Sequence, residues 1–295
     1  MELDLQEIRS VVVLADHLHF GRAASVPHVS QPALTKQIHK IEDTLGGALF
    51  VRKPRQITLM RAGEVFVARA RPLLNDVQVA ADVFRGALRG EAGLLRVGFG
   101  IAAIAGGLPD FIHRFRRRFP GVQIAMRDMS TPAQLAGLEN HTLDVGFVRV
   151  PVSSEEISAW PLFRDRLVVA VGPHTRSHPR RGLKLLAREP FIVLARSVSA
   201  SLYDHILRTC RAAGFTPRIV QEVAELFTAL NLVRAGAGVG LVPNSSKVLK
   251  VPRVRYFETG VPSADFSIGI AVHKSSTSDP VVSNFLSIVR ESYHP

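Results

Sequence analysis

Hydrogen-bond donors crowd one face of a predicted helix early in this chain. They are Gln31, Thr35, Lys36, Gln37, His39 and Lys40, and the first carboxylate after them is Glu42. Amide, hydroxyl and ammonium groups arranged in this way can donate to base edges and to phosphate oxygens. The pattern therefore predicts a surface that contacts nucleic acid.

The opposite face of the same helix is apolar and fixes how the donors are presented. Its stripe, with spacings of four, three and four, consists of Leu34, Ile38, Ile41 and Leu45. Ser30 is a suitable N-cap, and Pro32 falls in the first turn, where a missing N–H costs little. Gly46 and Gly47 end the helix, because glycine accepts the left-handed conformation past a C-terminus.

Two more helices are predicted before this one. The first has Asp4 as its N-cap and a stripe of Leu5, Ile8, Val12 and Ala15. The second contains the small residues Ala23 and Ala24, and a tight turn at residues 27–29 joins it to the donor-rich helix. Together these elements make a helix-turn-helix, whose second helix fits the DNA major groove. The alternative is a helical hairpin inside an ordinary core.

Cations continue into the following segment, residues 51–59. Arg52, Lys53 and Arg55 surround Pro54, and the end of the segment alternates in polarity. These features suit a β-hairpin wing laid along the phosphate backbone. The DNA-contacting residues expected from the helices and the wing are Arg22, Ser30, Gln31, Pro32, Thr35, Lys36, Arg52, Lys53 and Arg55.

Several motifs at fixed spacing make this region recognisable. The motifs F-x-x-A-A, S-Q-P-A-[LV]-[ST]-x-Q-I and L-E-x-x-L-G-x-x-L-F-x-R correspond to residues 20–24, 30–38 and 41–52. By these motifs the chain resembles the LysR-type transcriptional regulators over its whole length, nearest to the aromatic-catabolism subgroup. The family's wing ends in L-T-x-A-G, whereas Met60 stands here in place of the threonine, which removes a hydroxyl N-cap from the next helix.

A long helix is predicted from residue 62 to about residue 89. Its apolar residues form rows seven apart: Phe66, Leu73, Ala80 and Ala87, and Ala70, Val77 and Phe84. Such a seam suits pairing with another helix, and the family uses this linker helix for dimerisation. The alternative is a helix packed on its own domain. Pro72 is a candidate for a kink, and residues 90–93 are a hinge by composition.

Strands and helices alternate from residue 94 onward, which predicts mostly parallel sheets covered by helices. Strands are expected at 94–100, 122–127, 145–148, 167–171, 191–194, 218–222, 239–242 and 267–272. Helices are expected at 108–119, 131–139, 202–213, 225–235 and 281–291.

The resemblance implies the fold class and the domain limits. The fold class is a two-lobed α/β effector domain, similar to periplasmic solute-binding proteins, preceded by an all-α winged helix-turn-helix domain and a long linker helix. The DNA-binding domain is expected at 1–60, the linker helix at 61–92 and the effector domain at 93–295. Lobe I then comprises 93–163 and 268–295, lobe II comprises 164–267, and the chain crosses between them near Phe163 and Phe266.

A ligand in such a fold lies between the lobes, at strand ends and helix N-termini. The expected effector-binding residues are Ile101, Ala102, Ser130, Thr131, Arg149, Ser197, Ser199 and Thr228. By the resemblance, Thr131 and Arg149 fall on effector-contacting positions, and Ala102 falls where relatives often have serine. Arg149 could hold a carboxylate with two hydrogen bonds, or could instead pair with Asp144 or Glu155. Each serine or threonine could also be no more than an N-cap.

Composition adds bounds but does not identify the site. The formal net charge is +12, yet residues 1–92 contribute only +2, so the local pattern and not the global charge is the reason to expect DNA binding. The basic run Arg114–Arg118 is interpreted as a solvated helix face; an extra DNA or anion contact is the alternative. A single cysteine, Cys210, excludes an internal disulfide. No segment has the length of a membrane span, and residues 11–15 lack the flanks of a signal peptide.

The sequence therefore predicts a cytoplasmic, ligand-responsive DNA-binding transcription regulator and no enzyme, since it holds no metal-ligand spacing, phosphate-binding loop or dinucleotide fingerprint. Its expected partners are double-stranded promoter DNA, a small organic acid effector, further copies in a homodimer or homotetramer, and RNA polymerase. No cofactor and no membrane are expected. The alternatives are a solute-binding protein, a sensor whose ligand is not an anion, and a regulator without a small-molecule effector.

Overall fold

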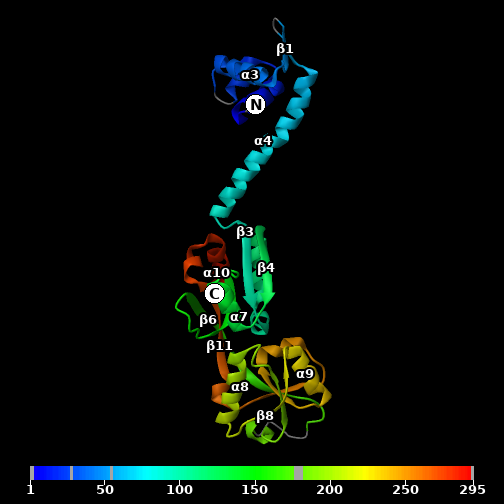
Figure 1. The fold of residues 1–295 in the computed structure, drawn as a ribbon, viewed down its shortest axis with the longest axis vertical. Coiled ribbons are helices and arrows are strands. Elements are labelled where there is room, and N and C mark those ends of the chain that lie inside the picture. Colours follow the sequence, from blue (N-terminus) through cyan, green and yellow to red (C-terminus); the bar gives the residue numbers. More distant parts are fainter. Residues whose placement is uncertain (1–2, 27–28, 54–55, 176–181, 294–295) are drawn as a thin grey trace. The chain divides into compact units, whose positions relative to one another are not determined.

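The computed structural model describes residues 3–26, 29–53, 56–175 and 182–293 (Figure 1). The chain divides into two compact units, Met1–Arg85 and Gly86–Pro295. The linker helix expected at 61–92 therefore belongs mostly to the first unit. Each unit has its own core and is described separately.

The first unit is a three-helix bundle with a hairpin and a long helix. Its bundle comprises α1 (Leu5–His17), α2 (Phe20–Ser25) and α3 (Gln31–Leu45). Asp4 caps α1 by accepting from the Gln6 N–H at 2.7 Å, and Ser30 caps α3 by accepting from the Ala33 N–H at 3.3 Å. Leu34, Ile38 and Ile41 are fully buried, as the apolar stripe predicted. The expected turn at residues 27–29 lies mostly outside the described residues.

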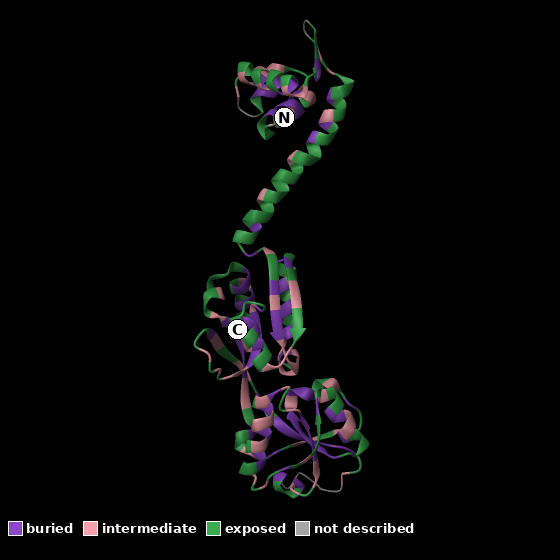
Figure 2. Cartoon of the chain, viewed as in Figure 1, coloured by how far each residue is buried: buried purple, intermediate pink, exposed green. Residues whose placement is uncertain are grey.

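The wing expected after the helices is a two-stranded antiparallel hairpin of β1 (Phe50–Lys53) and β2 (Gln56–Leu59), so the winged helix-turn-helix is confirmed and, among the described residues, its only strands are those of the wing. After it, α4 (Arg61–Leu88) runs as one helix through Pro72. Val67 and Ala70 are buried in the core of the bundle, whereas Leu73 and Phe84 are exposed. Figure 2 shows the resulting contrast between a mostly exposed α4 and the buried interior of the bundle.

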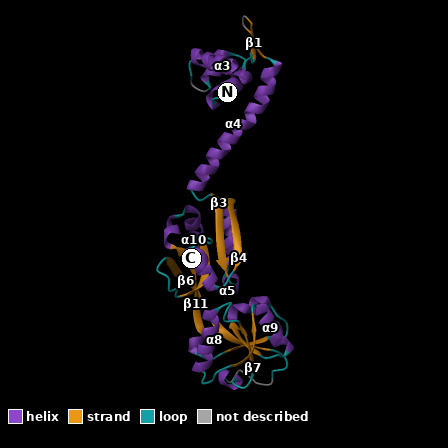
Figure 3. Cartoon of the chain, in the orientation of Figure 1, coloured by secondary structure: helices purple, strands orange, loops and turns teal. Residues whose placement is uncertain are grey.

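The second unit is built on one nine-stranded sheet in the order β4-β3-β5-β11-β6-β9-β7-β8, with β10 also paired to β6 (Figure 3). Its strands are β3 (Ala92–Phe99), β4 (Gly121–Asp128), β5 (Val145–Val150), β6 (Ile157–Val171), β7 (Pro190–Leu194), β8 (Arg218–Val223), β9 (Val239–Pro243), β10 (Arg255–Glu258) and β11 (Asp265–His273). Its α-helices are α5 (Ile101–Ala105), α6 (Leu108–Arg118), α7 (Thr131–Glu139), α8 (Ala200–Ala212), α9 (Leu226–Ala235) and α10 (Pro280–Tyr293). Short 3₁₀ turns complete it at Leu183–Leu186, Asn244–Leu249, Pro262–Ala264 and Lys274–Ser278.

The prediction of mostly parallel sheets is wrong at the centre of this unit. The outer pairs β3–β4, β3–β5, β7–β8 and β7–β9 are parallel, but β6 and β11 pair antiparallel to every strand they touch. The reason is that the chain crosses between lobes in both directions. Helical crossovers give parallel neighbours within each lobe, while the outgoing and returning strands run in opposite senses.

The two crossing strands form the joint between the lobes. β6 and β11 pair from Asp265 opposite Arg166 to His273 opposite Ile157. Their register shifts between Ile268 and Gly269, close to the predicted crossings at Phe163 and Phe266. β11 also pairs with β5 of lobe I, and β6 also pairs with β9 of lobe II. The two crossing strands therefore connect the strands of one lobe to those of the other.

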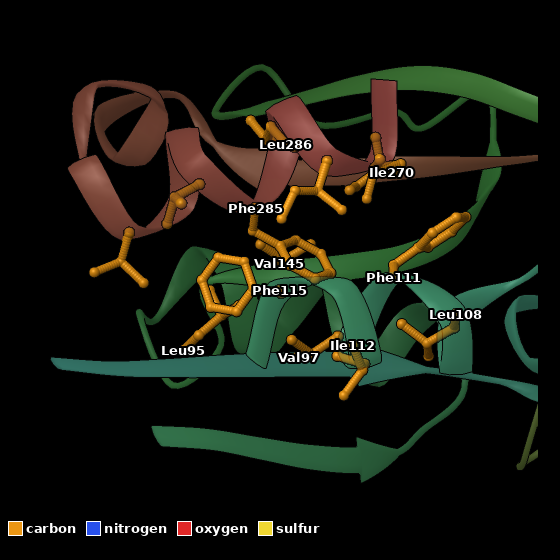
Figure 4. Close-up of a cluster of buried hydrophobic side chains, with 14 of the residues drawn as sticks. Leu95, Val97, Leu108, Phe111, Ile112, Phe115, Val145, Ile270, Phe285 and Leu286 are labelled. Atoms are coloured by element: carbon orange, nitrogen blue, oxygen red, sulfur yellow. The ribbon is translucent and has the colours of Figure 1, made fainter. Parts of the chain in front are cut away.

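Each lobe has its own apolar core. In lobe I, α6 and α10 pack over β3 and β5, and the rings of Phe115 and Phe285 meet edge to face with centroids 5.4 Å apart (Figure 4). In lobe II, α8 packs over Phe191 and Leu241, and α9 covers the other side of the sheet at Val168 and Ile192. These cores hold rigid the strand ends and helix N-termini that face the space between the lobes.

The Gly-Glu-Ala-Gly segment expected as a free hinge is anchored. Gly90 has φ of 68°, and a Cβ there would lie 2.5 Å from the backbone of Pro280. The Asn284 side chain on α10 donates to the Arg89 and Gly90 carbonyls at 3.0 and 3.2 Å. The glycine is thus required for close packing against α10.

Candidate DNA-reading helix and interlobe cavity

The exposed face of α3 carries a compact set of donors. A shallow depression on it is lined by Gln31, Pro32, Thr35, Lys36 and His39. The Thr35 hydroxyl donates to the Gln31 carbonyl at 2.9 Å, while the Gln31 and Lys36 side chains are exposed. Of the residues expected to contact DNA, Arg22 and Ser30 are exposed as well.

Two of the polar residues on this helix, Gln37 and Lys40, contact other residues of the protein. The Gln37 amide oxygen accepts from the Ser10 hydroxyl at 2.6 Å, and the Lys40 ammonium lies 2.5 Å from Glu7. Both contacts join α3 to α1. The surface left for reading bases is therefore narrower than the sequence indicated.

Arg52 also has protein partners, which the sequence did not predict. Its guanidinium donates to Glu42 at 2.7 Å and lies 2.6 Å from His39 Nε2. Glu42 Oε1 accepts from the Leu49 N–H at 2.8 Å and the Phe50 N–H at 3.3 Å, so one carboxylate ties α3, the following turn and β1 together. Lys53 is exposed and, among the described residues, makes no ion pair. Arg55 lies outside the described residues.

A cavity of about 490 Å³ lies between the lobes of the second unit. Lobe I contributes α5, the start of α7 and the end of β5; lobe II contributes the starts of α8 and α9. Of the expected effector-binding residues, those that line it are Ile101, Ala102, Ser130, Thr131, Arg149 and Ser199. Ser197 and Thr228 are exposed and do not line it.

Arg149 is the half-buried cation of this cavity. Its guanidinium lies 3.7 Å from the centroid of the Phe266 ring, and Nη1 lies 3.2 Å from His205 Nδ1. Its backbone N–H donates to the Thr131 hydroxyl at 3.1 Å. Contacts from α8 and β11 therefore position the side chain at the end of β5, and a contact from α7 holds the backbone there. Burial lowers the pKa of Arg149 to about 10, which leaves it charged at neutral pH.

His205 has one tautomer that fits its surroundings. Nε2 lies 2.6 Å from the Ser263 carbonyl, which can only accept, so Nε2 carries the hydrogen. Nδ1 is then an acceptor for Arg149. Burial lowers the pKa of His205, and Arg149 lowers it further, so the ring is held neutral. Nothing in the sequence indicated that His205 contacts Arg149, and Phe266 was expected only as a crossing between the lobes, because each is distant from Arg149 along the chain.

The local carboxylates that could have neutralised Arg149 are engaged elsewhere or do not reach it. Asp144 accepts from the Arg96 side chain at 2.8 and 3.0 Å. Glu155 is exposed, and no carboxylate among the described residues forms an ion pair with Arg149. The buried carboxylate of Asp165 is near enough to raise the pKa of Arg149, but it forms no ion pair with it, so Arg149 lines the cavity without a salt-bridge partner among the described residues.

The serines at the cavity are not used as caps. Ser130 and Ser199 occupy the N-cap positions of α7 and α8, but neither side chain bonds to its helix. Gln134 on α7 is 1% exposed, donates to the Met129 carbonyl at 2.9 Å, and leaves its Oε1 without a partner. The cavity therefore offers hydroxyls and an amide oxygen as well as a cation.

Two other predicted features have definite surroundings. The basic run on α6 packs in part on α10, where Arg114 donates to the Ile288 carbonyl at 2.6 Å and Arg118 lies 3.4 Å from Glu291. Cys210 is buried, and burial raises the pKa of its thiol to about 12. No cluster suited to a metal ion, and no helix long and apolar enough to cross a bilayer, occurs within the described part of the chain.

A helix-turn-helix module joined to a two-lobed α/β domain with an interlobe cavity defines a class: DNA-binding regulators that respond to a ligand. Family models described as "Bacterial regulatory helix-turn-helix protein, lysR family" and "LysR substrate binding domain" match residues 5–64 and 88–293. The chain belongs to the LysR family of transcriptional regulators, and not to a family of enzymes.

Individual relatives agree over the full length. The uncharacterized HTH-type transcriptional regulator YnfL of Escherichia coli is 35% identical over 289 residues, which are 97% of each chain. The regulator TfdS of Cupriavidus pinatubonensis is 32% identical over 98% of each chain. The crystal structure of full-length CbnR complexed with its target DNA matches with a TM-score of 0.81 and 26% identity, covering 99% of this chain and 100% of that one.

Proposed function

We propose that this regulator senses a small organic acid in the interlobe cavity and thereby changes its action at a promoter. The observation that carries the proposal is Arg149, a half-buried guanidinium that lines the cavity and forms no ion pair among the described residues. A carboxylate that accepts from Arg149 would also reach a surface with unused hydroxyls at Ser130 and Ser199.

The proposed coupling follows from where the contacts lie. The lining comes from both lobes, and the lobes are joined by the β6–β11 pair. A ligand held by both sides would favour one lobe arrangement over others, by no more than its difference in affinity for them. That arrangement would set the spacing of DNA-reading heads in a dimer or tetramer formed through α4, with RNA polymerase as a further partner in the cytoplasm.

The test is a calorimetric and thermal-shift screen of aromatic and dicarboxylic acids. Wild type is compared with Arg149→Ala and with Arg208→Ala, which removes an exposed cation that influences Arg149 but does not line the cavity. Loss of a charge-assisted pair should weaken binding by about 10- to 100-fold in Arg149→Ala only. Equal binding by both variants would show that Arg149 is structural. Hits confined to neutral or cationic compounds would favour the alternative of a non-anionic ligand.

A further inference from the structure

The cavity holds acidic groups as well as Arg149. Asp128, at the end of β4 in lobe I, and Glu225, just before α9 in lobe II, both line it. Among the described residues neither carboxylate has a hydrogen-bond or ion-pair partner. The lining therefore presents two exposed negative side chains from opposite lobes and one half-buried positive side chain.

The two carboxylates influence each other across the cavity. Partial burial raises the pKa of Asp128, and the charge of Glu225 raises it further. Glu225 is the N-cap residue of α9, and its side chain makes no hydrogen bond to that helix. A cation placed between the two groups would relieve their repulsion and contact both lobes at once.

A third acceptor lines the same cavity independently of this pair. The Gln134 side chain is 1% exposed, and its Oε1 has no partner. That oxygen is shielded from solvent and lies beside Gly146 of β5, so Gln134 adds a polar wall to the cavity. The acceptors open to a ligand are the carboxylates of Asp128 and Glu225, and they complement the donor Arg149.

We propose that the effector is amphoteric: an amino acid or related amine-bearing acid whose carboxylate binds Arg149 and whose ammonium is held by Asp128 and Glu225. This deepens the proposed function and rests on it. The middle of such a ligand is apolar, because Phe147, Leu202 and Phe266 also line the cavity. A dicarboxylic acid is disfavoured, since its second charge would face a pair of carboxylates.

The experiment uses matched acids that differ only in the amine. Phenylalanine is paired with 3-phenylpropanoate, leucine with 4-methylpentanoate, and 6-aminohexanoate with hexanoate. Each is titrated calorimetrically into the full-length protein and into Arg149→Ala, Asp128→Asn, Glu225→Gln and Glu155→Gln. Glu155 is an exposed acid of the same unit that does not line the cavity, so its variant controls for net charge. Unfolding temperatures without ligand check that every variant is folded.

At least one amine-bearing acid should bind about tenfold or more tightly than its amine-free match. Asp128→Asn and Glu225→Gln should each remove most of that preference, Arg149→Ala should weaken both members of the pair, and Glu155→Gln should change neither. Binding of the amine-free acids that depends on Arg149 and is not improved by the amine overturns this inference but leaves the proposed function intact. If no carboxylate binds in an Arg149-dependent way, both fail. An amine preference that survives in both acidic-residue variants also overturns the inference.

Discussion

Arg149 depends for its orientation on single residues contributed by other elements. It contacts the Phe266 ring, the Thr131 hydroxyl and the His205 imidazole. The imidazole can accept a hydrogen bond from the Arg149 guanidinium only while it is neutral. Protonation of His205 would remove that acceptor and place two cations in contact. The state of one histidine therefore affects both the fold and the candidate effector site.

We expect the stability of the second unit to fall on acidification below about pH 6.5, the ordinary pKa of histidine. The pKa of His205 is lowered in the folded state, so below that pH the unfolded chain binds the proton more readily and stability declines as pH falls. The slope from this residue can reach about 1.4 kcal/mol per pH unit. Denaturant unfolding of wild type and His205→Gln between pH 5 and 7.5 measures it. His113→Gln, at an exposed histidine, should keep the wild-type slope; the same slope in His205→Gln would contradict the prediction.

Base reading is expected from Gln31 and Lys36, the exposed donors on the N-terminal part of α3. Replacing either by alanine should reduce discrimination between operator and altered operator by about 1–3 kcal/mol per lost base contact. Effector binding should not change, because these residues lie in the other unit. Competition binding to single-base operator variants is the measurement. Lys40→Ala is the control, since Lys40 pairs with Glu7; undiminished selectivity in both reading variants would rule out this assignment.

At the scale of elements, strand β1 of the wing carries two neighbouring cations with different surroundings, Arg52 and Lys53. Arg52 joins β1 to α3 through Glu42 and His39, whereas Lys53 is exposed at the next position. The alternation of a strand places neighbouring side chains on opposite faces, which explains their different surroundings. Replacing Arg52 should therefore affect the stability of the unit, whereas replacing Lys53 should affect DNA binding.

Arg52→Ala should lower the free energy of unfolding of the first unit by about 1–3 kcal/mol, because it leaves Glu42 with an unpaired oxygen in a mostly buried position. Lys53→Ala should leave stability within about 0.5 kcal/mol but reduce the salt dependence of DNA binding by about one unit of slope. Denaturation curves measure the change in stability. DNA-binding titrations between about 50 and 200 mM salt measure the change in salt dependence. If Arg52→Ala keeps the wild-type stability and only reduces the salt dependence of DNA binding, Arg52 contacts phosphate and the structural role assigned to it is wrong.

For the whole molecule, the expectation that α4 pairs with a second copy concerns the state of assembly. The first part of its heptad seam is used within its own domain, where Ala70 is 4% exposed. The rest is open: Leu73 is 46% and Phe84 is 65% exposed. The alternative of a helix packed on its own domain thus holds for the first turns only, and the remaining seam is available to a second copy.

Phe84→Glu should weaken self-association by about 100-fold or more, since burying an unpaired charge in a helix interface costs several kcal/mol. Light scattering and sedimentation at micromolar concentrations, with and without DNA, provide the measurement. Val79→Glu is the matched control, because Val79 is 50% exposed on the same helix but lies off the seam. A wild-type monomer under all conditions, or equal effects of the two variants, would reject the seam as the interface.

Much of the local structure could be predicted from sequence. Periodicity and capping residues predicted α7 with its observed limits of Thr131–Glu139, the N-caps Asp4 and Ser30, and the buried stripe of α3. These features depend on neighbours within a few residues, which the sequence displays directly. The first part of β6 and all of β10 were missed, since their exposed or mixed residues alternate weakly.

Contacts between distant residues required the tertiary structure. Arg149 and His205 are 56 positions apart, and Arg52 and Glu42 belong to different elements, so no local pattern signals that they meet. The antiparallel joint of β6 and β11 likewise follows from the chain leaving and re-entering a lobe. The sequence by itself determined the family, the reading helix and most elements. Only the fold decided which cations are engaged by the protein and which acids share a cavity with Arg149, because burial and pairing depend on groups brought together from far along the chain.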